Sequence, residues 1–383
     1  MKKNVLFVVL MLALVLVGCA EHEHVWNEGE ISKDASCTEV GEMTYTCETC
    51  KATRTEVIPA MGHSYEFEIA TPATCVENGV ETEVCSVCKE KSGETRTIPA
   101  AHKYDADGVC SVCGAKKDEV EKAEARIGTK YYATLTDAIK SLKEKEDKVA
   151  IINILKNSVK LEDFSNITGS KNNSTYNITF VGAGASNTTM DVNTGADMSK
   201  PAAEGSRGAN YIEEAKLTFK DLTVCIGANA NYQGFIRAGE LAFDSCAIEG
   251  MGTYWGVGDV IFTNCEFKDN KDYSLWLYSG KNFVFENCSF TSSAGKFLHP
   301  YNEGSISLTV AIKNCSFENT SEAEESGKPI VNIKTQAVCK VSFEGDIKLV
   351  NIATGKQESK YFQVESDNGS VVLVDGEQVY PKN

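Results

Sequence analysis

The sequence predicts a mainly β protein in which small repeats rich in cysteine and histidine precede a parallel β-solenoid with a short N-terminal cap helix. Three observations support this prediction. A Cys/His pattern returns every 39 residues in the first third of the chain, a short amphipathic segment follows it, and five similar hexapeptides follow at intervals of 19 to 27 residues. Such periods indicate that one supersecondary unit is used several times.

Residues 1–18 are expected to be a signal peptide. Lys2 and Lys3 precede an apolar run over 5–17, which is too short to span a bilayer comfortably. The run ends in "LVGC" at Cys19, which resembles the lipobox of bacterial lipoproteins. The resemblance implies cleavage before Cys19, a lipidated N-terminus over 19–23, and anchoring in the bacterial cell envelope, facing outside the cytoplasm. An uncleaved helix or plain secretion is the alternative.

The net charge of -16 and the isoelectric point near 4.9 argue against a nucleic-acid partner. Nucleic acid needs a basic face to neutralise its phosphates.

The next segment repeats a pattern of one histidine and three cysteines. "HVW", "HSY" and "HKY" stand 39 residues apart, and the cysteines between them keep the same internal spacing. The repeats are expected over 24–62, 63–101 and a shortened 102–115. Their candidate ligands are His24, Cys37, Cys47, Cys50, His63, Cys75, Cys85, Cys88, His102, Cys110 and Cys113.

These residues suit a structural zinc better than a disulfide framework. Three cysteines in a repeat leave one unpaired, and disulfides have no use for the recurring histidine. One His and three Cys supply the four ligands of tetrahedral zinc, and a C-x-x-C turn lets two thiolates face one ion. A repeat of 39 residues buries little core, so a bound metal would provide the missing stability.

Two ligand groupings are open. If each His leads its repeat, the groups are His24 with Cys37, Cys47 and Cys50, and His63 with Cys75, Cys85 and Cys88. His102, Cys110 and Cys113 then lack one ligand, which Asp105, Asp107 or water would supply. If each His closes the preceding repeat, His24 is idle. We prefer the first grouping because it uses every histidine.

The repeats resemble the zinc-ribbon-like Cys/His repeats of surface proteins from anaerobic bacteria. The resemblance implies a spacer or display module, because a closed four-ligand site leaves no position for substrate.

Residues 116–126, "KKDEVEKAEAR", are expected to be a linker. Thr134 and Asp137 then form a capping-box pattern, and Leu135, Ala138, Ile139 and Leu142 share one helical face. The strand "VAIINIL" over 149–155 follows. This order suits a cap that covers the first layer of a solenoid.

The hexapeptides predict the solenoid itself. They are "FKDLTV", "FDSCAI", "FTNCEF", "FENCSF" and "IKNCSF", which begin at residues 219, 243, 262, 285 and 312. Positions one, four and six are apolar, and position three is Asp, Ser or Asn, which tolerate a left-handed corner between two strands. Position four reads Leu222, Cys246, Cys265, Cys288 and Cys315, which we interpret as buried thiols rather than a metal or redox site.

This pattern and its cap resemble the right-handed parallel β-helix of pectate-lyase-like proteins, over residues 127–383. A β-sandwich is the structural alternative. The family's calcium-dependent lyases use acidic residues and a Lys or Arg base, for which the chain offers only scattered candidates: Asp244, Glu266, Asp269, Lys271 and Arg237. No catalytic motif transfers, so we assign no catalytic residue and favour a non-catalytic surface protein for adhesion or carbohydrate binding. A polysaccharide lyase or glycoside hydrolase is the alternative.

A strip of outward side chains is the predicted ligand-binding face. Aligning "FIRAG", "YWGVG" and "LWLYSG" on their last glycines places Tyr254 beside Trp276 and Arg237 beside Tyr278. Leu275 and Leu277 are expected to point inward, so alternation turns Trp276 and Tyr278 outward. "FLHPYN" would extend the strip through His299 and Tyr301. Aromatic rings along a rigid sheet can pack against sugar rings.

Overall fold

The computed structural model describes residues 23–162, 164, 167, 176–192, 211–225, 237–249, 253–255, 258–268, 272–279, 281–302, 307–321, 327–366 and 369–381. The chain divides into two compact units, residues 1–101 and 102–383, here called the N-terminal unit and the C-terminal unit. The third Cys/His repeat therefore lies in the C-terminal unit, although the sequence pattern groups it with the first two repeats over residues 24–115.

The N-terminal unit contains two three-stranded antiparallel sheets, one in each of the first two repeats. Among its described residues, the buried hydrophobic side chains are Cys37, Cys47, Val84 and Cys85, so the sheets have almost no apolar core. The strands are β1 (Glu30–Lys33), β2 (Gly41–Thr46), β3 (Thr53–Ile58), β4 (Tyr65–Thr71), β5 (Gly79–Cys85) and β6 (Lys91–Ile98).

In the C-terminal unit, a cap follows the third repeat directly. The expected linker contains α1 (Lys117–Lys122) and the start of β7 (Ala125–Ile127), which pairs with β8 (Lys130–Tyr132) and with β9 (Lys148–Ile154). The predicted cap helix is α2 (Leu135–Lys140), and Thr134 Oγ1 accepts a hydrogen bond from Asp137 N at 3.0 Å. The apolar face of α2 is buried as predicted.

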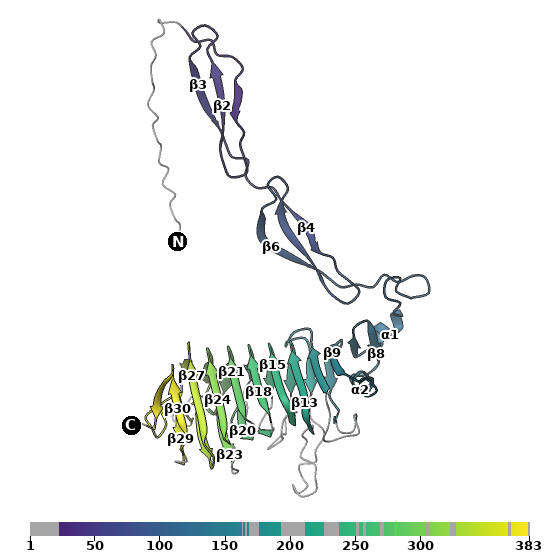
Figure 1. The fold of residues 1–383 in the computed structure, drawn as a ribbon, viewed down its shortest axis with the longest axis vertical. Helices are drawn as coiled ribbons and strands as arrows, with labels where there is room; N and C mark the ends of the chain where they lie inside the picture. Colours follow the sequence, from purple (N-terminus) through teal and green to yellow (C-terminus); the bar gives the residue numbers. More distant parts are fainter. Residues whose placement is uncertain are drawn as a thin grey trace. The chain divides into compact units, whose positions relative to one another are not determined.

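Three mainly parallel sheets form the rest of the C-terminal unit. Figure 1 labels strands of the 12-stranded and five-stranded sheets. From β15 onward the chain passes from the 12-stranded sheet to the eight-stranded sheet, then to the five-stranded sheet, and returns to the first. This order is repeated through β27, β28 and β29, so the mainly β architecture is confirmed and is compatible with a solenoid.

The strand bounds are as follows. The 12-stranded sheet contains, besides β7, β8 and β9, the strands β11 (Tyr176–Val181), β13 (Tyr211–Lys220), β15 (Arg237–Asp244), β18 (Asp259–Thr263), β21 (Asn282–Glu286), β24 (Leu308–Lys313), β27 (Cys339–Glu344), β30 (Val371–Val374) and β31 (Glu377–Tyr380). The eight-stranded sheet contains β10 (Ser158–Lys160), β12 (Thr189–Asp191), β14 (Thr223–Cys225), β16 (Ala247–Glu249), β19 (Glu266–Phe267), β22 (Ser289–Ser292), β25 (Ser316–Asn319) and β28 (Lys348–Val350). The five-stranded sheet contains β17 (Thr253–Trp255), β20 (Leu275–Ser279), β23 (Leu298–Asn302), β26 (Val331–Thr335) and β29 (Phe362–Val364).

The hexapeptides form the core between the first two of these sheets, as predicted. Their first, fourth and sixth residues are all at most 2% exposed. Phenylalanines stack along the first column, with ring centroids 4.7 Å apart for Phe243 and Phe262. The thiols of the fourth column donate to backbone carbonyls, as Cys246 Sγ does to Phe219 O at 3.2 Å. These contacts are those of satisfied core residues.

The third residue of each hexapeptide has the predicted left-handed backbone. The φ angles lie between 52° and 57° at Asp221, Ser245, Asn264, Asn287 and Asn314. This corner turns the chain from the 12-stranded to the eight-stranded sheet, so that both neighbouring strands direct apolar residues inward.

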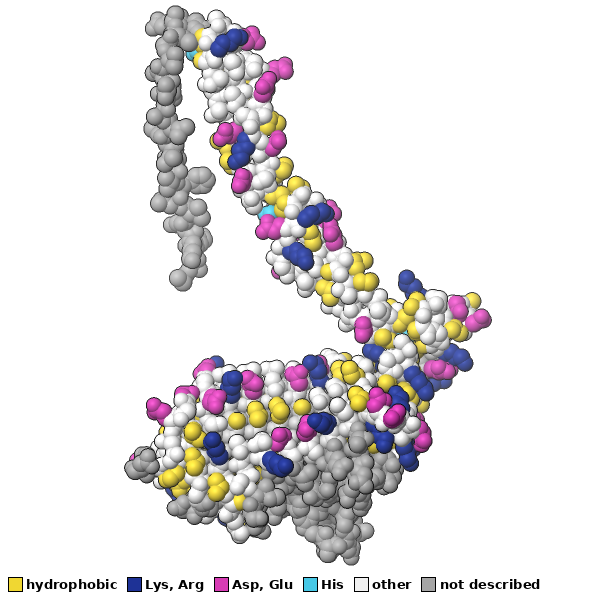
Figure 2. All heavy atoms as spheres, in the orientation of Figure 1, with side chains coloured by type: hydrophobic (Ala, Val, Ile, Leu, Met, Phe, Trp, Pro, Cys, Tyr) yellow, Lys and Arg dark blue, Asp and Glu magenta, His cyan; other side chains and the backbone are white. Residues whose placement is uncertain are grey.

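The outer face of the 12-stranded sheet carries a short hydrophobic row between charged columns (Figure 2). Strand register aligns Ala242, Ile261, Val284 and Ala311 in this row, and Ile261 is 43% exposed. Among the described residues, no helix has the length and apolar character needed to cross a membrane.

The left-handed corner gives a first prediction. Replacing Asn287 with valine should lower the free energy of unfolding by about 1–2 kcal/mol, because a β-branched side chain is strained at positive φ. Asn287→Gly is the matched control, since glycine adopts this conformation freely. Urea unfolding of the C-terminal unit measures both variants, and equal stability of the two would contradict the prediction.

Candidate metal sites and binding face

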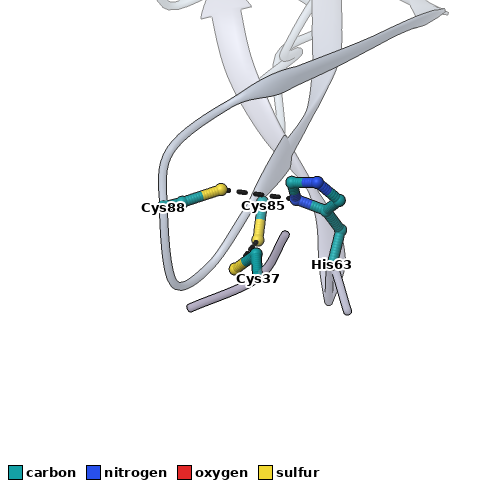
Figure 3. A group of neighbouring side chains, drawn as sticks. All are labelled: Cys37, His63, Cys85 and Cys88. Atoms are coloured by element: carbon teal, nitrogen blue, oxygen red, sulfur yellow. Dashed lines mark hydrogen bonds between the residues drawn. The ribbon is translucent and has the colours of Figure 1, made fainter. Parts of the chain in front are cut away.

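One complete Cys/His group joins the first two repeats. Cys37 comes from the loop between β1 and β2, His63 precedes β4, Cys85 ends β5 and Cys88 lies in the turn to β6. The four side chains point toward one another (Figure 3), and their ligand atoms all lie within 4.8 Å of each other. Cys37 Sγ is 3.8 Å from Cys85 Sγ, and Cys88 Sγ is 3.3 Å from His63 Nδ1.

These distances fit a tetrahedral metal site. Two sulfurs at the Zn–S distance of about 2.3 Å and the tetrahedral angle lie about 3.8 Å apart, whereas a disulfide bond is about 2.05 Å long. The described cysteines of the chain form no disulfide. The donor set therefore fits zinc by ligand type, by number and by spacing.

Backbone amides prepare one thiol of this group for metal binding. The pKa of Cys85 is lowered to about 5, chiefly by hydrogen bonding to the backbone of Cys88, with Val87 and His63 adding to the effect against the cost of burial. Burial and the neighbouring cysteines raise the pKa of Cys37 to about 11. Glu90 lies 3.6 Å from His63 Nε2, where a carboxylate can orient a ligating imidazole.

The grouping differs from both expectations, because Cys37 lies with the ligands of the next repeat rather than with His24, Cys47 and Cys50. Strand geometry is the reason. Cys37 precedes β2 and Cys47 follows it, and a strand of six residues extends about 20 Å. The two cysteines are therefore at opposite ends of the sheet and cannot share one ion.

The loop that carries Cys37 is held at the entrance to the second repeat. Met61 N donates to Ser36 O at 2.9 Å, and Gly62 N donates to Cys37 O at 3.1 Å. Gly41 makes this loop possible, since a Cβ there would lie 2.6 Å from the backbone nitrogen of Ala35. His63 follows directly and completes the group.

The first group contains His24, Cys47 and Cys50 among the described residues. Cys50 Sγ lies 3.4 Å from His24 Nδ1. Two segments bring these ligands together: the C-x-x-C turn after β2 and the His-x-aromatic segment. Trp26 of the second segment pairs with Cys47 in an isolated antiparallel β-bridge.

The third repeat brings together His102, Cys110 and Cys113 in the same arrangement, with Cys113 Sγ 3.3 Å from His102 Nδ1. The other ring nitrogen, Nε2, lies 2.7 Å from Tyr131 Oη on β8. Asp105 does not serve as the expected extra ligand, because its Oδ1 accepts from the backbone nitrogens of Asp107 and Val109 in a local turn.

The predicted binding strip is divided between two sheets: Arg237 begins β15 of the 12-stranded sheet, whereas Tyr254, Trp276 and Tyr278 lie on strands of the five-stranded sheet. The register along the five-stranded sheet also differs from the predicted one. Leu275 and Leu277 are fully buried as predicted, and Trp276 between them is half-buried on the outer side. Trp276 pairs with Thr253 rather than with Tyr254, which pairs with Leu277. An irregularity between Tyr254 and Trp255 shifts the register that the glycines suggested. The side chains of Arg237, Tyr254 and Tyr278 lie outside the described residues.

The neighbouring strands place His299 and Tyr301 next to Trp276, as expected for an extended strip. His299 pairs directly with Trp276, and its ring centroid lies 4.4 Å from that of the indole. The Tyr301 ring lies 5.4 Å from the Trp276 ring. Trp276 Nε1 donates to Asp272 Oδ2 at 3.1 Å, and Lys296 binds the other oxygen of Asp272 at 2.8 Å, which fixes the indole.

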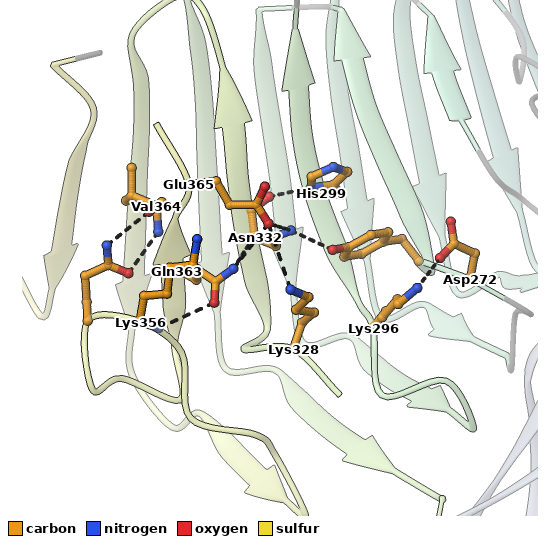
Figure 4. A network of polar contacts seen from close by, with 11 residues as sticks. Asp272, Lys296, His299, Lys328, Asn332, Lys356, Gln363, Val364 and Glu365 are labelled. Atoms are coloured by element: carbon orange, nitrogen blue, oxygen red, sulfur yellow. Dashed lines mark hydrogen bonds and ion pairs between the residues drawn. The ribbon is translucent and has the colours of Figure 1, made fainter. Parts of the chain in front are cut away.

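A buried polar network continues from these rings across β26 and β29 (Figure 4). Asn332 Nδ2 donates to Tyr273 Oη at 2.6 Å and to Glu365 Oε1 at 3.1 Å. Gln363 Nε2 donates to the same Glu365 oxygen at 3.2 Å and to Asn332 Oδ1 at 3.1 Å. His299 Nδ1 lies 2.5 Å from the Asn332 carbonyl oxygen, to which it donates. Such a fully bonded network holds its members in one arrangement.

The network favours the ionised form of Glu365, whereas burial favours the neutral form of His299. Burial alone would raise the pKa of Glu365, but the Asn332 hydrogen bond and the charges of Lys328 and Lys334 lower it overall. Burial lowers the pKa of His299, against the opposing effects of the Asn332 carbonyl, Glu365 and Asp272. The pKa of Tyr273 is raised to about 12, mainly by burial.

Sequence reasoning missed Asp272, Tyr273, Asn332, Gln363 and Glu365. Asn332 and Gln363 are each the polar middle residue of an apolar strand, in "VNI" and "FQV", and this alternation was the available signal.

The remaining predicted positions form no shared site. Asp244, on the 12-stranded sheet, is paired with Lys220 at 2.8 Å, and Glu266 lies on the eight-stranded sheet. Cys19, Asp269 and Lys271 lie outside the described residues. Comparisons of the chain with protein-family models, with curated proteins and with solved structures find no match.

The buried histidine gives a second prediction. Because the pKa of His299 is lower in the folded chain than its ordinary value of 6.5, the unfolded chain binds more protons below that pH. The free energy of unfolding of the C-terminal unit should therefore fall as the pH drops from 6.5 toward 5. Glutamine can keep the hydrogen bond to the Asn332 carbonyl, so His299→Gln should flatten this dependence in urea unfolding. An unchanged slope in the variant would contradict the prediction.

Proposed function

We propose that this chain is a non-catalytic, lipid-anchored protein of a bacterial cell surface. Its C-terminal unit, as a right-handed parallel β-helix, binds carbohydrate, and its N-terminal repeats hold structural zinc. Support for the β-helix comes from the recurring order of the three parallel sheets and from the stacked hexapeptides. The lipobox-like "LVGC" supports attachment to a membrane through Cys19.

The binding face is proposed on a single observation: an aromatic pair lies on the same sheet face as a carboxylate that is held in a fixed orientation. Trp276 and Tyr301 are half-buried on the outer face of the five-stranded sheet, and Glu365 on the same face is held by Asn332 and Gln363. Aromatic faces pack against the apolar faces of sugar rings, while an ionised carboxylate accepts hydrogen bonds from sugar hydroxyls. Because these groups are already oriented, little conformational entropy is lost on binding.

Zinc is proposed for the Cys/His groups because three thiolates and one imidazole at tetrahedral spacing are its usual structural ligands. The repeat equivalence extends to Cys75, which has the place in the second repeat that Cys37 has in the first. Ala101 N donates to Thr74 O directly before His102, just as Met61 N donates to Ser36 O before Gly62 and His63. We therefore propose that Cys75, like Cys37, is a metal ligand.

The zinc content tests this proposal. We expect about two tightly bound zinc ions and a weaker third in the full chain, and Cys85→Ser should remove about one of them because it eliminates one of the four ligands in its group. Cys225→Ser, which removes a half-buried thiol outside the groups, is the matched control. Metal analysis with thiol counting on chelator-free protein gives the answer. Oxidised Cys85 and Cys88 without bound zinc would overturn the assignment.

Carbohydrate binding is tested with a panel of immobilised polysaccharides. Wild-type protein should be retained by at least one, and Trp276→Ala combined with Tyr301→Ala should lower the retained fraction about tenfold or more, because the stacking surface is removed. Ile261→Ala, on the outer face of the 12-stranded sheet, should leave retention unchanged. A folded double variant that still binds would place the site elsewhere, and new unsaturated chain ends would favour the alternative function of a polysaccharide lyase.

A further inference from the structure

The Cys/His group that contains Cys37 takes its ligands from two different repeats, and this suggests a role beyond stabilising each repeat. Cys37 belongs to the first repeat, whereas His63, Cys85 and Cys88 belong to the second. A metal ion held by all four would therefore connect, through coordinate bonds, two sheets that follow one another in the chain.

Little else in the described residues holds these two sheets together. Every residue of β1 is exposed, as are most residues of β3 and β4. Of the four buried hydrophobic residues in the unit, three are thiols and the fourth is Val84, which is 8% exposed. Because so little apolar area is buried, the hydrophobic effect contributes little to the contact. The segment that connects the two sheets is attached to the Cys37 loop by the hydrogen bonds of Met61 and Gly62.

The third repeat shows a comparable connection to the rest of the C-terminal unit. His102 faces Cys113 with Nδ1 and Tyr131 with Nε2, so one imidazole connects the metal ligands to β8. Strand β8 pairs with β7, and β7 pairs with β9 in the 12-stranded sheet. Lys117 N also donates to Gly108 O at 2.9 Å, which attaches the start of α1 to the same repeat.

We propose that the metal sites act as joints between consecutive modules: with metal bound, each joint is rigid, and without metal the modules move independently. These joints rest on the zinc binding proposed above, which would then also control the rigidity between modules. A change in metal occupancy would change the stiffness of the segment that precedes the C-terminal unit. On metal removal, the joint would lose its rigidity before the strands within each module lose their pairing.

Hydrogen–deuterium exchange on the full zinc-loaded chain tests the first joint. In Cys37→Ser the second repeat keeps His63, Cys85 and Cys88, so the amides of β5 should stay protected while those of Met61 and Gly62 exchange at least tenfold faster. Cys47→Ser, which removes a ligand of the first group only, is the control and should leave Met61 and Gly62 protected. Unchanged protection of Met61 and Gly62 in Cys37→Ser with zinc still bound would overturn the joint. Absence of zinc from the wild-type chain would instead overturn the metal assignment itself.

The second joint is tested with Tyr131→Phe, which removes the hydroxyl that contacts His102 Nε2. Partners of ligating histidines contribute about 10- to 100-fold to metal affinity, so the variant should lose zinc from the third repeat at about tenfold lower chelator concentration. Tyr132→Phe is the matched control, because the Tyr132 hydroxyl accepts from Ser141 instead. Faster exchange of the β8 amides should accompany zinc loss. Equal chelator sensitivity of the two variants would overturn the role of Tyr131.

Discussion

In-register parallel pairing is the constraint on which the C-terminal unit depends. Each residue pairs with its counterpart in the next strand, so Phe243 lies over Phe262 and Phe262 over Phe285. Columns of identical chemistry follow from this, and each buried phenylalanine contributes about 1.5–3 kcal/mol. The same pairing places Trp276 beside His299 and Asn332 beside Gln363 on the opposite side of the five-stranded sheet. The core and the candidate binding face are therefore two results of one register.

The N-terminal unit has no such columns, and its strands expose most of their side chains. A sheet of three short strands without a core is marginally stable in water. The thiols of Cys37, Cys47 and Cys85 are instead its buried residues, and each belongs to a group of metal ligands. Buried apolar area therefore contributes little to the stability of this part of the chain, and the proposed metal coordination at a few positions would supply most of it.

The parts that the sequence predicted well depend on local patterns. The capping box at Thr134, the left-handed corner at Asn287 and the inward Leu275 and Leu277 each follow from neighbours along the chain. The ligand grouping around Cys37 and the pairing of Trp276 with Thr253 depend on strand length and on an irregular register. The contact of Glu365 with Asn332 joins residues 33 positions apart. Repeat spacing identified the ligand types, but it could not show which ends of the strands meet.

The two units therefore respond to different perturbations. Protons compete with a metal for the thiolate ligands, and chelators compete with the thiolates for the metal. If the proposed metal is bound, acid or chelation would therefore act first on the Cys/His groups. The columns of the C-terminal unit contain no metal ligands and lose structure through solvation of apolar surface or protonation of His299. Because the third repeat contacts β8 through His102 and Tyr131, loss of the proposed metal would also affect the cap of the C-terminal unit. That cap covers the first layer of the apolar core. The cap is therefore the element through which the proposed metal binding and the packing of the core would affect one another.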